Sequence, residues 1–345
     1  MRAFAPGYHR DHMEGVTLML VAVIILAVFF DYINGFHDTA NAIATSVATR
    51  ALHPRQAIAM ATVFNFVGAF AGTAVAKTIG SGLVEEQTTT QAVVMAALLG
   101  AITWNLVTWW LGLPSSSSHA LIGGLLGSTL VASGLGAFNV GGIVGKVLIP
   151  MIASPLLGFV GAFGLMILIY WVFRKVRRRP LGRVFKRVQV VSAGFMAFSH
   201  GSNDAQKTMG IVTLALFSAG VIPDVTVPTW VIVLAATALS LGTAIGGWRI
   251  MRTMGHRVAD LEPVHGFASE TTAATILFTT AHLGIPVSTT HVISSAIMGV
   301  GSSRGPRGVR WGVARNILVA WVLTIPAAAF VAALAWFILN VVGLA

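Results

Sequence analysis

One short polar signature occurs twice in this chain, each time within long apolar sequence. Residues 111–119 read LGLPSSSSH and residues 283–291 read LGIPVSTTH, and the two copies align without a gap. A looser pair precedes them, NGFHD at 34–38 and HGSND at 200–204. Two halves that each place a charged segment and a hydroxyl-rich turn at membrane depth are typical of secondary transporters.

The composition indicates a membrane environment. Hydrophobic residues make up 56% of the chain and charged residues 10%, and the mean hydropathy is +0.82. Apolar runs such as 151–173 and 317–342 reach the roughly 20 residues that a spanning helix needs, and they do not alternate as barrel strands do. We therefore predict an all-α polytopic membrane protein without a cleaved signal peptide and, since there is no cysteine, without thiol chemistry.

Basic residues predict the orientation. The net charge of +11 fits the positive-inside rule better than nucleic-acid binding, which we do not expect. The segments predicted to be cytoplasmic are 50–55, 174–187, 249–257 and 304–310. The loops 78–90 and 214–228 contain no Lys or Arg and are predicted to lie outside.

The predicted topology is two inverted repeats, residues 1–173 and 188–345, joined by the cytoplasmic linker 174–187. Each repeat makes three crossings, which places both termini outside, and each carries a broken helix and one re-entrant hairpin, at 91–133 or 266–301. The crossings are predicted at 16–49, 57–77, 151–173, 190–213, 229–248 and 311–342. Residues 138–150 have no clear assignment, and an interfacial helix is one interpretation.

Each hairpin is predicted to turn at a helix-breaking Gly-x-Pro. Gly112 and Pro114 precede the first hydroxyl group, and Gly284 and Pro286 precede the second. Proline lacks an N–H and clashes with the preceding helical turn. Non-helical backbone at membrane depth needs protein or water around it, so we expect the two turns to face each other across a central site.

Hydroxyl side chains at a helix start, together with free backbone N–H groups and the helix dipole, favour an anion. Two such helix starts are predicted to surround a small tetrahedral oxyanion, with ordinary N-capping as the alternative. The candidate anion-binding residues are Ser116, Ser117, Ser118, Ser288, Thr289 and Thr290.

Two aspartates interrupt apolar segments, where a charge costs about 2.5–3.5 kcal/mol on insertion scales and is rarely without function. Asp38 and Asp204 follow Gly35 and Gly201, which suit unwound backbone whose carbonyls would coordinate a cation or relay protons. The candidate coupling-ion residues are Asn34, His37, Asp38, Asn41, Asn203, Asp204 and Lys207. No resident metal or cofactor is expected.

The two copies differ where a coupling cation would bind. Asn41 stands three residues after Asp38, whereas Lys207 stands three residues after Asp204. A fixed ammonium would take the place of a sodium ion or help to neutralise the anion. Histidine is the side-chain type whose ordinary pKa lies near neutral pH, and because His37 and His200 stand near the aspartates, we interpret the pattern as favouring proton over sodium coupling.

Four further side chains are assigned supporting roles. His119 and His291 follow the hydroxyl groups and either donate to the anion or fix the turn. His200 lies near Asp204 in the sequence, and Glu270 is interpreted as a gate or relay residue, with surface exposure as the alternative.

These motifs resemble those of the inorganic phosphate transporter (PiT) family, most closely its bacterial low-affinity phosphate permeases. The resemblance covers Asp31–Ala44, Leu111–Gly127, Ala197–Gly210 and Gly284–Gly299, in that order. It implies proton symport of phosphate, often as a neutral complex with a divalent metal ion, with phosphate at the hydroxyl turns and the coupling cation at the aspartates. The sodium-coupled branch usually has Asn-Asp with a following Asn in both copies, and His37 and Lys207 depart from that pattern.

The sequence thus predicts a secondary active symporter of inorganic phosphate in the plasma (inner) membrane that works by alternating access. An enzyme is not expected, because no metal triad, nucleophile–base pair or nucleotide loop is recognisable. Three alternatives stay open: a sodium-coupled phosphate symporter, a transporter of another oxyanion such as sulfate, and an anion channel. Phosphate and the lipid bilayer are the expected partners, and assembly into a homo-oligomer is left open.

Overall fold

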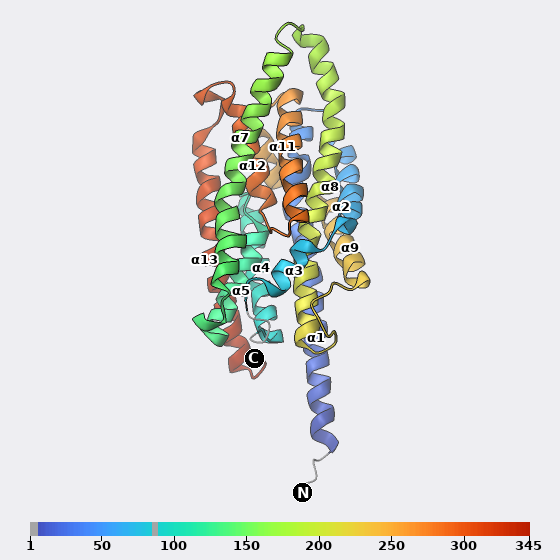
Figure 1. Ribbon diagram of the computed structural model, residues 1–345, viewed down its shortest axis with the longest axis vertical. Coiled ribbons are helices and arrows are strands. Elements are labelled where there is room, and N and C mark those ends of the chain that lie inside the picture. The colour runs from blue at the N-terminus through green and yellow to red at the C-terminus, as the bar shows by residue number, and fades with distance from the viewer. Residues whose placement is uncertain (1–5, 85–88) are drawn as a thin grey trace.

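The computed structural model describes residues 6–84 and 89–345 as a bundle of long helices (Figure 1). The predicted outer loop 78–90 therefore lies partly outside the described residues. Within the described ranges, the only β pairing is two isolated bridges. Four described helices are long and apolar enough to cross a membrane, and six spans result if two bent pairs each count as one. The predicted all-α membrane fold is confirmed. The predicted crossing 190–213 is not among these spans, however, and Gln91–Leu111, predicted to be an arm of a re-entrant hairpin, is one of them.

The elements alternate between long helices and short helical turns. The part up to Val172 contains α1 (Pro6–Ala48), α2 (Pro54–Gly68), a 3-10 turn (Ala69–Ala71), α3 (Ala74–Ser81), α4 (Gln91–Leu111), α5 (Ser117–Ser133), a 3-10 turn (Leu135–Ala137), α6 (Val140–Ile143), a π-helical turn (Val144–Leu148) and α7 (Ile149–Val172). The remainder contains α8 (Arg178–Ser218), α9 (Thr229–Ile245), α10 (Trp248–Arg252), a π-helical turn (Thr253–Arg257), α11 (Pro263–His282), α12 (Thr289–Ser302), a 3-10 turn (Pro306–Gly308) and α13 (Trp311–Val341).

The two predicted hairpins correspond to pairs of packed helices. Hairpin 91–133 is α4 with α5, and hairpin 266–301 is α11 with α12. The segment 138–150 does not form a separate interfacial helix, because α6 and the π-helical turn continue into α7 as one apolar stretch, Val140–Val172. Most of the segment 174–187 is helical, since α8 begins at Arg178.

The predicted unwound backbone at Gly35 and Gly201 is wrong. α1 and α8 run through both aspartate motifs without interruption. The two glycines serve close helix packing: a Cβ at Gly35 would collide with the Leu239 carbonyl of α9, and one at Gly201 would collide with the Asn65 backbone of α2. The bends fall elsewhere, at 72° between α2 and α3 and at 59° between α9 and α10.

Each hairpin turn is clamped by a threonine from one of these bent regions. Gly112 and Gly284 both adopt the left-handed φ of 67° that glycine tolerates. The Thr253 hydroxyl donates to the Gly112 carbonyl at 2.9 Å, and the Thr78 hydroxyl donates to the Gly284 carbonyl at 2.7 Å. The helix breaks predicted from the Gly-x-Pro pattern are thus present, and distant segments hold them in place.

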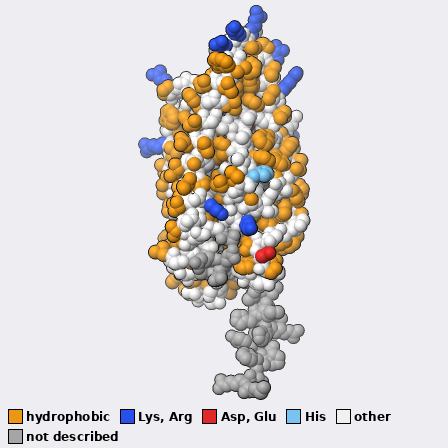
Figure 2. All heavy atoms as spheres, in the orientation of Figure 1, with side chains coloured by type: hydrophobic (Ala, Val, Ile, Leu, Met, Phe, Trp, Pro, Cys, Tyr) orange, Lys and Arg blue, Asp and Glu red, His pale blue; other side chains and the backbone are white. Residues whose placement is uncertain are grey.

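The ends of the bundle differ in charge. The start of α1 and the end of α13 lie at one end in Figure 1, and the α7–α8 connection lies at the other. On the face seen in Figure 2, Lys and Arg side chains gather mainly at the α7–α8 end, and apolar side chains cover much of the flanks. This distribution fits a protein that crosses a bilayer along its long axis.

We predict opposite effects of alanine at two helical glycines. Gly201→Ala should lower the thermal unfolding midpoint in detergent, because the methyl group overlaps the Asn65 backbone and overpacking typically costs about 1–3 kcal/mol. Gly164→Ala in α7 is the matched control, because nothing lies within 4 Å of its Cβ position. There alanine should gain about 0.5–1 kcal/mol of helix propensity. Equal midpoints would contradict the packing role.

Candidate functional site

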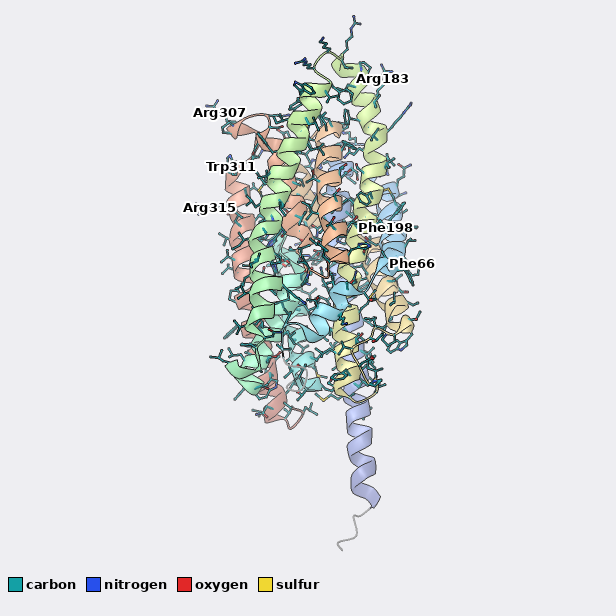
Figure 3. All side chains as sticks on the ribbon, in the orientation of Figure 1. Phe66, Arg183, Phe198, Arg307, Trp311 and Arg315 are labelled. Atoms are coloured by element: carbon teal, nitrogen blue, oxygen red, sulfur yellow. The ribbon has the colours of Figure 1, made fainter. Side chains whose placement is uncertain are left out.

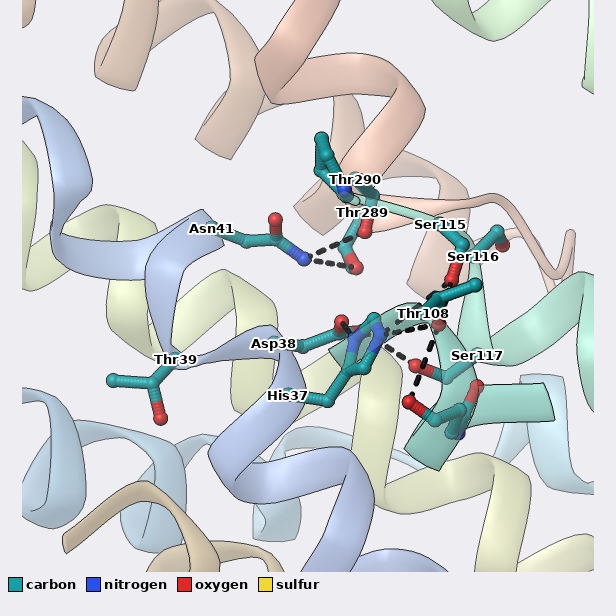
Figure 4. Close-up of polar contacts among 12 residues, drawn as sticks. His37, Asp38, Thr39, Asn41, Thr108, Ser115, Ser116, Ser117, Thr289 and Thr290 are labelled. Carbon is teal, nitrogen blue, oxygen red and sulfur yellow. Dashed lines mark hydrogen bonds and ion pairs between the residues drawn. The ribbon is translucent and has the colours of Figure 1, made fainter. Parts of the chain in front are cut away.

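The two hairpin turns meet beside the C-terminal third of α1 (Figure 4). The Asn41 amide donates to the hydroxyls of Thr289 and Thr290, at 3.2 and 2.9 Å. One helical turn earlier, Asp38 accepts a hydrogen bond of 2.8 Å from the Ser117 hydroxyl. The two turns also touch directly, because Ser118 donates to the Val287 carbonyl at 3.3 Å. The predicted convergence of the two hydroxyl groups is therefore present.

Ser116 and Ser288 act as N-caps. Each hydroxyl accepts a hydrogen bond of 3.2 Å from the backbone N–H three residues later, that of His119 or His291. The capping alternative thus accounts for the position of these two serines. Ser117, Ser118, Thr289 and Thr290 instead direct their hydroxyls to other elements.

A hydrogen-bonded chain orients the Asp38 carboxylate. His37 Nδ1 lies 2.6 Å from one Asp38 oxygen, and His37 Nε2 lies 3.0 Å from the Thr108 hydroxyl of α4. The Ser115 hydroxyl donates to the Thr108 hydroxyl at 2.8 Å. All of these side chains are buried. Sequence reasoning missed Thr108, because nothing in its local sequence distinguishes it from other helix hydroxyls, and it missed Ser115, because this serine aligns with the apolar Val287 of the second copy.

A buried ion pair on α8 lies close to the hydrogen-bonded residues around Asp38. The Lys207 ammonium lies 2.7 Å from one oxygen of Asp204, and His200 Nε2 lies 3.4 Å from the other. The second His200 nitrogen lies 3.1 Å from the Asn65 side-chain oxygen. The side chains of Lys207 and Asp204 are 0% exposed. A complete ion pair in the interior of a membrane bundle keeps both charges compensated.

The aspartates of the two motifs approach each other. Asp38, His200 and Asp204 each offer a ligand atom, and these atoms lie within 4.8 Å of one another. Carboxylate and imidazole ligands suit several divalent cations. Lys207 already occupies one oxygen of Asp204, so the arrangement offers a small cation site that a built-in ammonium partly fills.

Some polar groups of the motifs remain unpaired within the described part of the chain. Both amide atoms of Asn34 and of Asn203, and both carboxylate oxygens of Asp31, have no hydrogen-bond partner there. Asp31 lies beside Asn34 and Thr208 and is fully buried. Sequence reasoning did not assign Asp31, although an acid one helical turn before Asn34 in an apolar segment was an available signal.

Glu270 is buried, and the surface alternative for it is wrong. Its carboxylate accepts hydrogen bonds from Thr45 at 2.6 Å, from Gln189 at 3.0 Å and from Ser192 at 2.5 Å. These donors belong to α1 and α8, so Glu270 of α11 joins three helices. This position fits a gate residue, a role that stays a prediction.

The histidines after the two turns contact each other. The rings of His119 and His291 meet edge to face, with centroids 4.7 Å apart. His291 also stacks on Trp321 of α13 at 3.9 Å, and the Trp321 indole N–H donates to the Pro114 carbonyl at 3.1 Å. The contacts favour the turn-fixing interpretation of both histidines, and Trp321 is a further residue that the sequence did not indicate.

Comparison with known proteins finds that the chain is similar to phosphate transporters. Residues 34–332 match the model of the phosphate transporter family. A probable low-affinity inorganic phosphate transporter of Bacillus subtilis is 46% identical over 333 residues, covering 96% of this chain and 100% of the relative. Another of the same description, from Rhizobium meliloti, is 48% identical over 329 residues, covering 94% and 98%.

A solved structure has the same overall fold. It is described as the sodium-dependent phosphate transporter and superposes with a TM-score of 0.86 at 28% identity. The match covers 94% of this chain and 100% of that one.

The Lys207–Asp204 pair should govern stability. Lys207→Met leaves a buried carboxylate without its counter-charge, and breaking such a pair typically costs about 3–5 kcal/mol. Adding Asp204→Asn removes the orphaned charge and should recover most of the loss. Thermal unfolding midpoints in detergent measure both effects. A double variant no more stable than Lys207→Met alone would contradict this account.

Proposed function

The chain belongs to the phosphate transporter family, and from that premise we propose that it is a proton-coupled symporter that brings inorganic phosphate into the cell by alternating access. The observation that carries the proposal is the Lys207 ammonium, bound to Asp204 at 2.7 Å where the first motif has the neutral Asn41. A cation that is part of the chain removes the need for one bound from solution at that position.

The hydroxyl turns are the proposed phosphate site. Ser117 and Ser118 begin α5, and Thr289 and Thr290 begin α12, so two helix starts with hydroxyls and backbone N–H groups meet beside Asp38 and Asn41. The N-terminal ends of the two helix dipoles add positive potential there. Phosphate entering this point would replace the present hydrogen bonds of these hydroxyls to Asp38, Asn41 and Val287.

Charge balance favours protons as the coupled ion. Asp204 is paired with Lys207, and Asp38 is hydrogen-bonded to His37. Asp31 has no ion pair among the described residues, so protonation is the simplest way to compensate its charge. A phosphate anion that moves together with protons, and in some cycles with a divalent metal ion, forms a near-neutral load. Such a load avoids most of the cost of carrying charge through a low-dielectric core.

Paired contacts support two inverted repeats, residues 1–173 and 188–345, that rock against each other. The clamp of Thr253 on Gly112 has a counterpart in the clamp of Thr78 on Gly284. We propose that the two clamps open in turn, one toward each side of the plasma membrane. In the proposed orientation both termini lie outside and the segment 174–187 is cytoplasmic.

Sodium coupling is the second candidate, and a specific observation favours it. The group of Asp38, His200 and Asp204 could hold a cation, and the structural neighbour is described as sodium-dependent. The same group would contact a divalent metal ion carried with phosphate. Lys207 argues against a further cation at this place, because it adds like charge beside the carboxylates.

Labelled phosphate uptake into proteoliposomes tests the proposal, with a pH gradient and a Na⁺ gradient imposed separately. We expect concentrative uptake with the pH gradient alone, little competition from sulfate, and loss of that uptake in Asp38→Asn and Ser117→Ala. Ser128→Ala is the matched control, because this buried hydroxyl of α5 bonds only carbonyls of its own helix, and it should retain uptake.

Uptake that requires Na⁺ would establish the sodium-coupled candidate instead. Phosphate movement that never exceeds equilibrium under either gradient would indicate a channel. Wild-type uptake by Asp38→Asn would contradict the proposed role of the aspartates.

A further inference from the structure

A cavity rich in arginine lies directly behind the first hairpin turn. It has a volume of about 440 Å³. We call it the arginine pocket; its lining residues are Trp110, Leu111, Gly112, Trp248, Arg249, Arg252, Thr253 and Arg257. No acidic side chain is among the lining residues.

The pocket is at the basic end of the bundle. Gly255, in the π-helical turn that supplies Arg257, packs against Ala44 and Ala48 at the end of α1. The same turn is tied to the basic segment 304–310, because Arg310 donates to the His256 carbonyl at 2.7 Å. In the proposed orientation this end faces the cytoplasm.

The arginines of the pocket lack counter-ions. Neighbouring arginines at this end are neutralised: Arg304 lies 2.8 Å from Glu262, and Arg310 lies 2.8 Å from Asp260. Within the described ranges, by contrast, Arg252 and Arg257 have neither an ion pair nor a side-chain hydrogen bond, and both are exposed.

Arg249 is bound to the first hairpin. Its guanidinium donates to the Trp110 carbonyl at 2.6 Å and lies over the Trp109 ring at 5.6 Å. Together with the bond from Thr253 to the Gly112 carbonyl, it fixes the backbone that leads into the turn. The arginine pocket is therefore lined in part by the first hairpin turn, which leads directly into Ser117 at the central site.

We propose that the arginine pocket is a phosphate-binding vestibule on the cytoplasmic side, which receives phosphate as it leaves the hydroxyl turns. This inference rests on the proposed function. A concave surface with several uncompensated positive charges focuses the field and concentrates anions. Guanidinium groups bind phosphate oxygens in a two-pronged geometry that lysine does not reproduce. The headgroup of an anionic lipid offers similar chemistry, and the test separates the two sources.

The test uses the full chain in vesicles of zwitterionic lipid. The vesicles are sorted by whether a C-terminal tag is accessible from outside, so that phosphate transport from each side of the protein is measured separately. The Arg252→Gln/Arg257→Gln variant should raise the half-saturating inorganic phosphate concentration on the pocket side by about three- to tenfold and weaken its salt dependence. The opposite side should be unchanged. The Arg252→Lys/Arg257→Lys variant should recover part of the loss, because it restores charge without the two-pronged geometry.

The control removes two other exposed arginines of the same end. Figure 3 shows Arg307 and Arg315 extending outward, away from the bundle. Arg307→Gln/Arg315→Gln lowers the net charge equally and should leave half-saturation on both sides unchanged. Equal effects of the two double variants would overturn the proposal, because they would reflect overall charge alone.

A second arm adds anionic phosphatidylglycerol to the vesicles. If the pocket holds a lipid headgroup, wild-type transport will depend on this lipid, the pocket variant will not respond to it, and half-saturation in zwitterionic lipid will be the same for both. That result would overturn the vestibule. A wild type that moves no phosphate in any vesicle would instead contradict the proposed function itself, which distinguishes the two failures.

Discussion

The ion pair between Lys207 and Asp204 sets the charge balance on which the rest of the site depends. Both groups are fully buried at a separation of 2.7 Å. In a medium with little water, an uncompensated ammonium or carboxylate would be costly, so each group requires the other. With Asp204 satisfied from within the chain, Asp38 and Asp31 are the carboxylates of α1 that, in the proposed function, respond to the substrate and its coupled ion.

Close helix packing makes this arrangement possible. α1 and α8 carry the two aspartate motifs as continuous helices, and glycines on both let α9 and α2 approach at backbone distance. The motifs therefore do not need unwound backbone to bring their side chains together. Non-helical backbone lies in the hairpin turns and at the bends after α2 and α9, and Thr253 and Thr78 of these bent regions donate to the glycine carbonyls of the turns. This agrees with the rule that irregular backbone survives at membrane depth only inside protein.

The sequence predicts most of the fold because its strongest signals are local. Apolar run length predicts five of the six spans that the described helices allow, and a Gly-x-Pro before a hydroxyl group predicts both hairpin turns. The sequence wrongly predicts unwound backbone at Gly35. Glycine suits both unwound backbone and close helix packing, and only the position of the neighbouring helix shows which of the two applies. Thr108 and Trp321 escape notice because their partners come from distant segments. Asp31 had a local signal, but its lack of a partner is visible only in three dimensions.

The most direct measurement is the ion dependence of phosphate uptake by Lys207→Asn, which gives the second motif the amide that the first has at Asn41. If the lysine takes the place of a bound cation, this variant should lose uptake driven by the pH gradient alone and regain it when Na⁺ is added, whereas Lys207→Arg should stay sodium-independent. Uptake by Lys207→Asn that responds to Na⁺ no more than the wild type does would contradict the account.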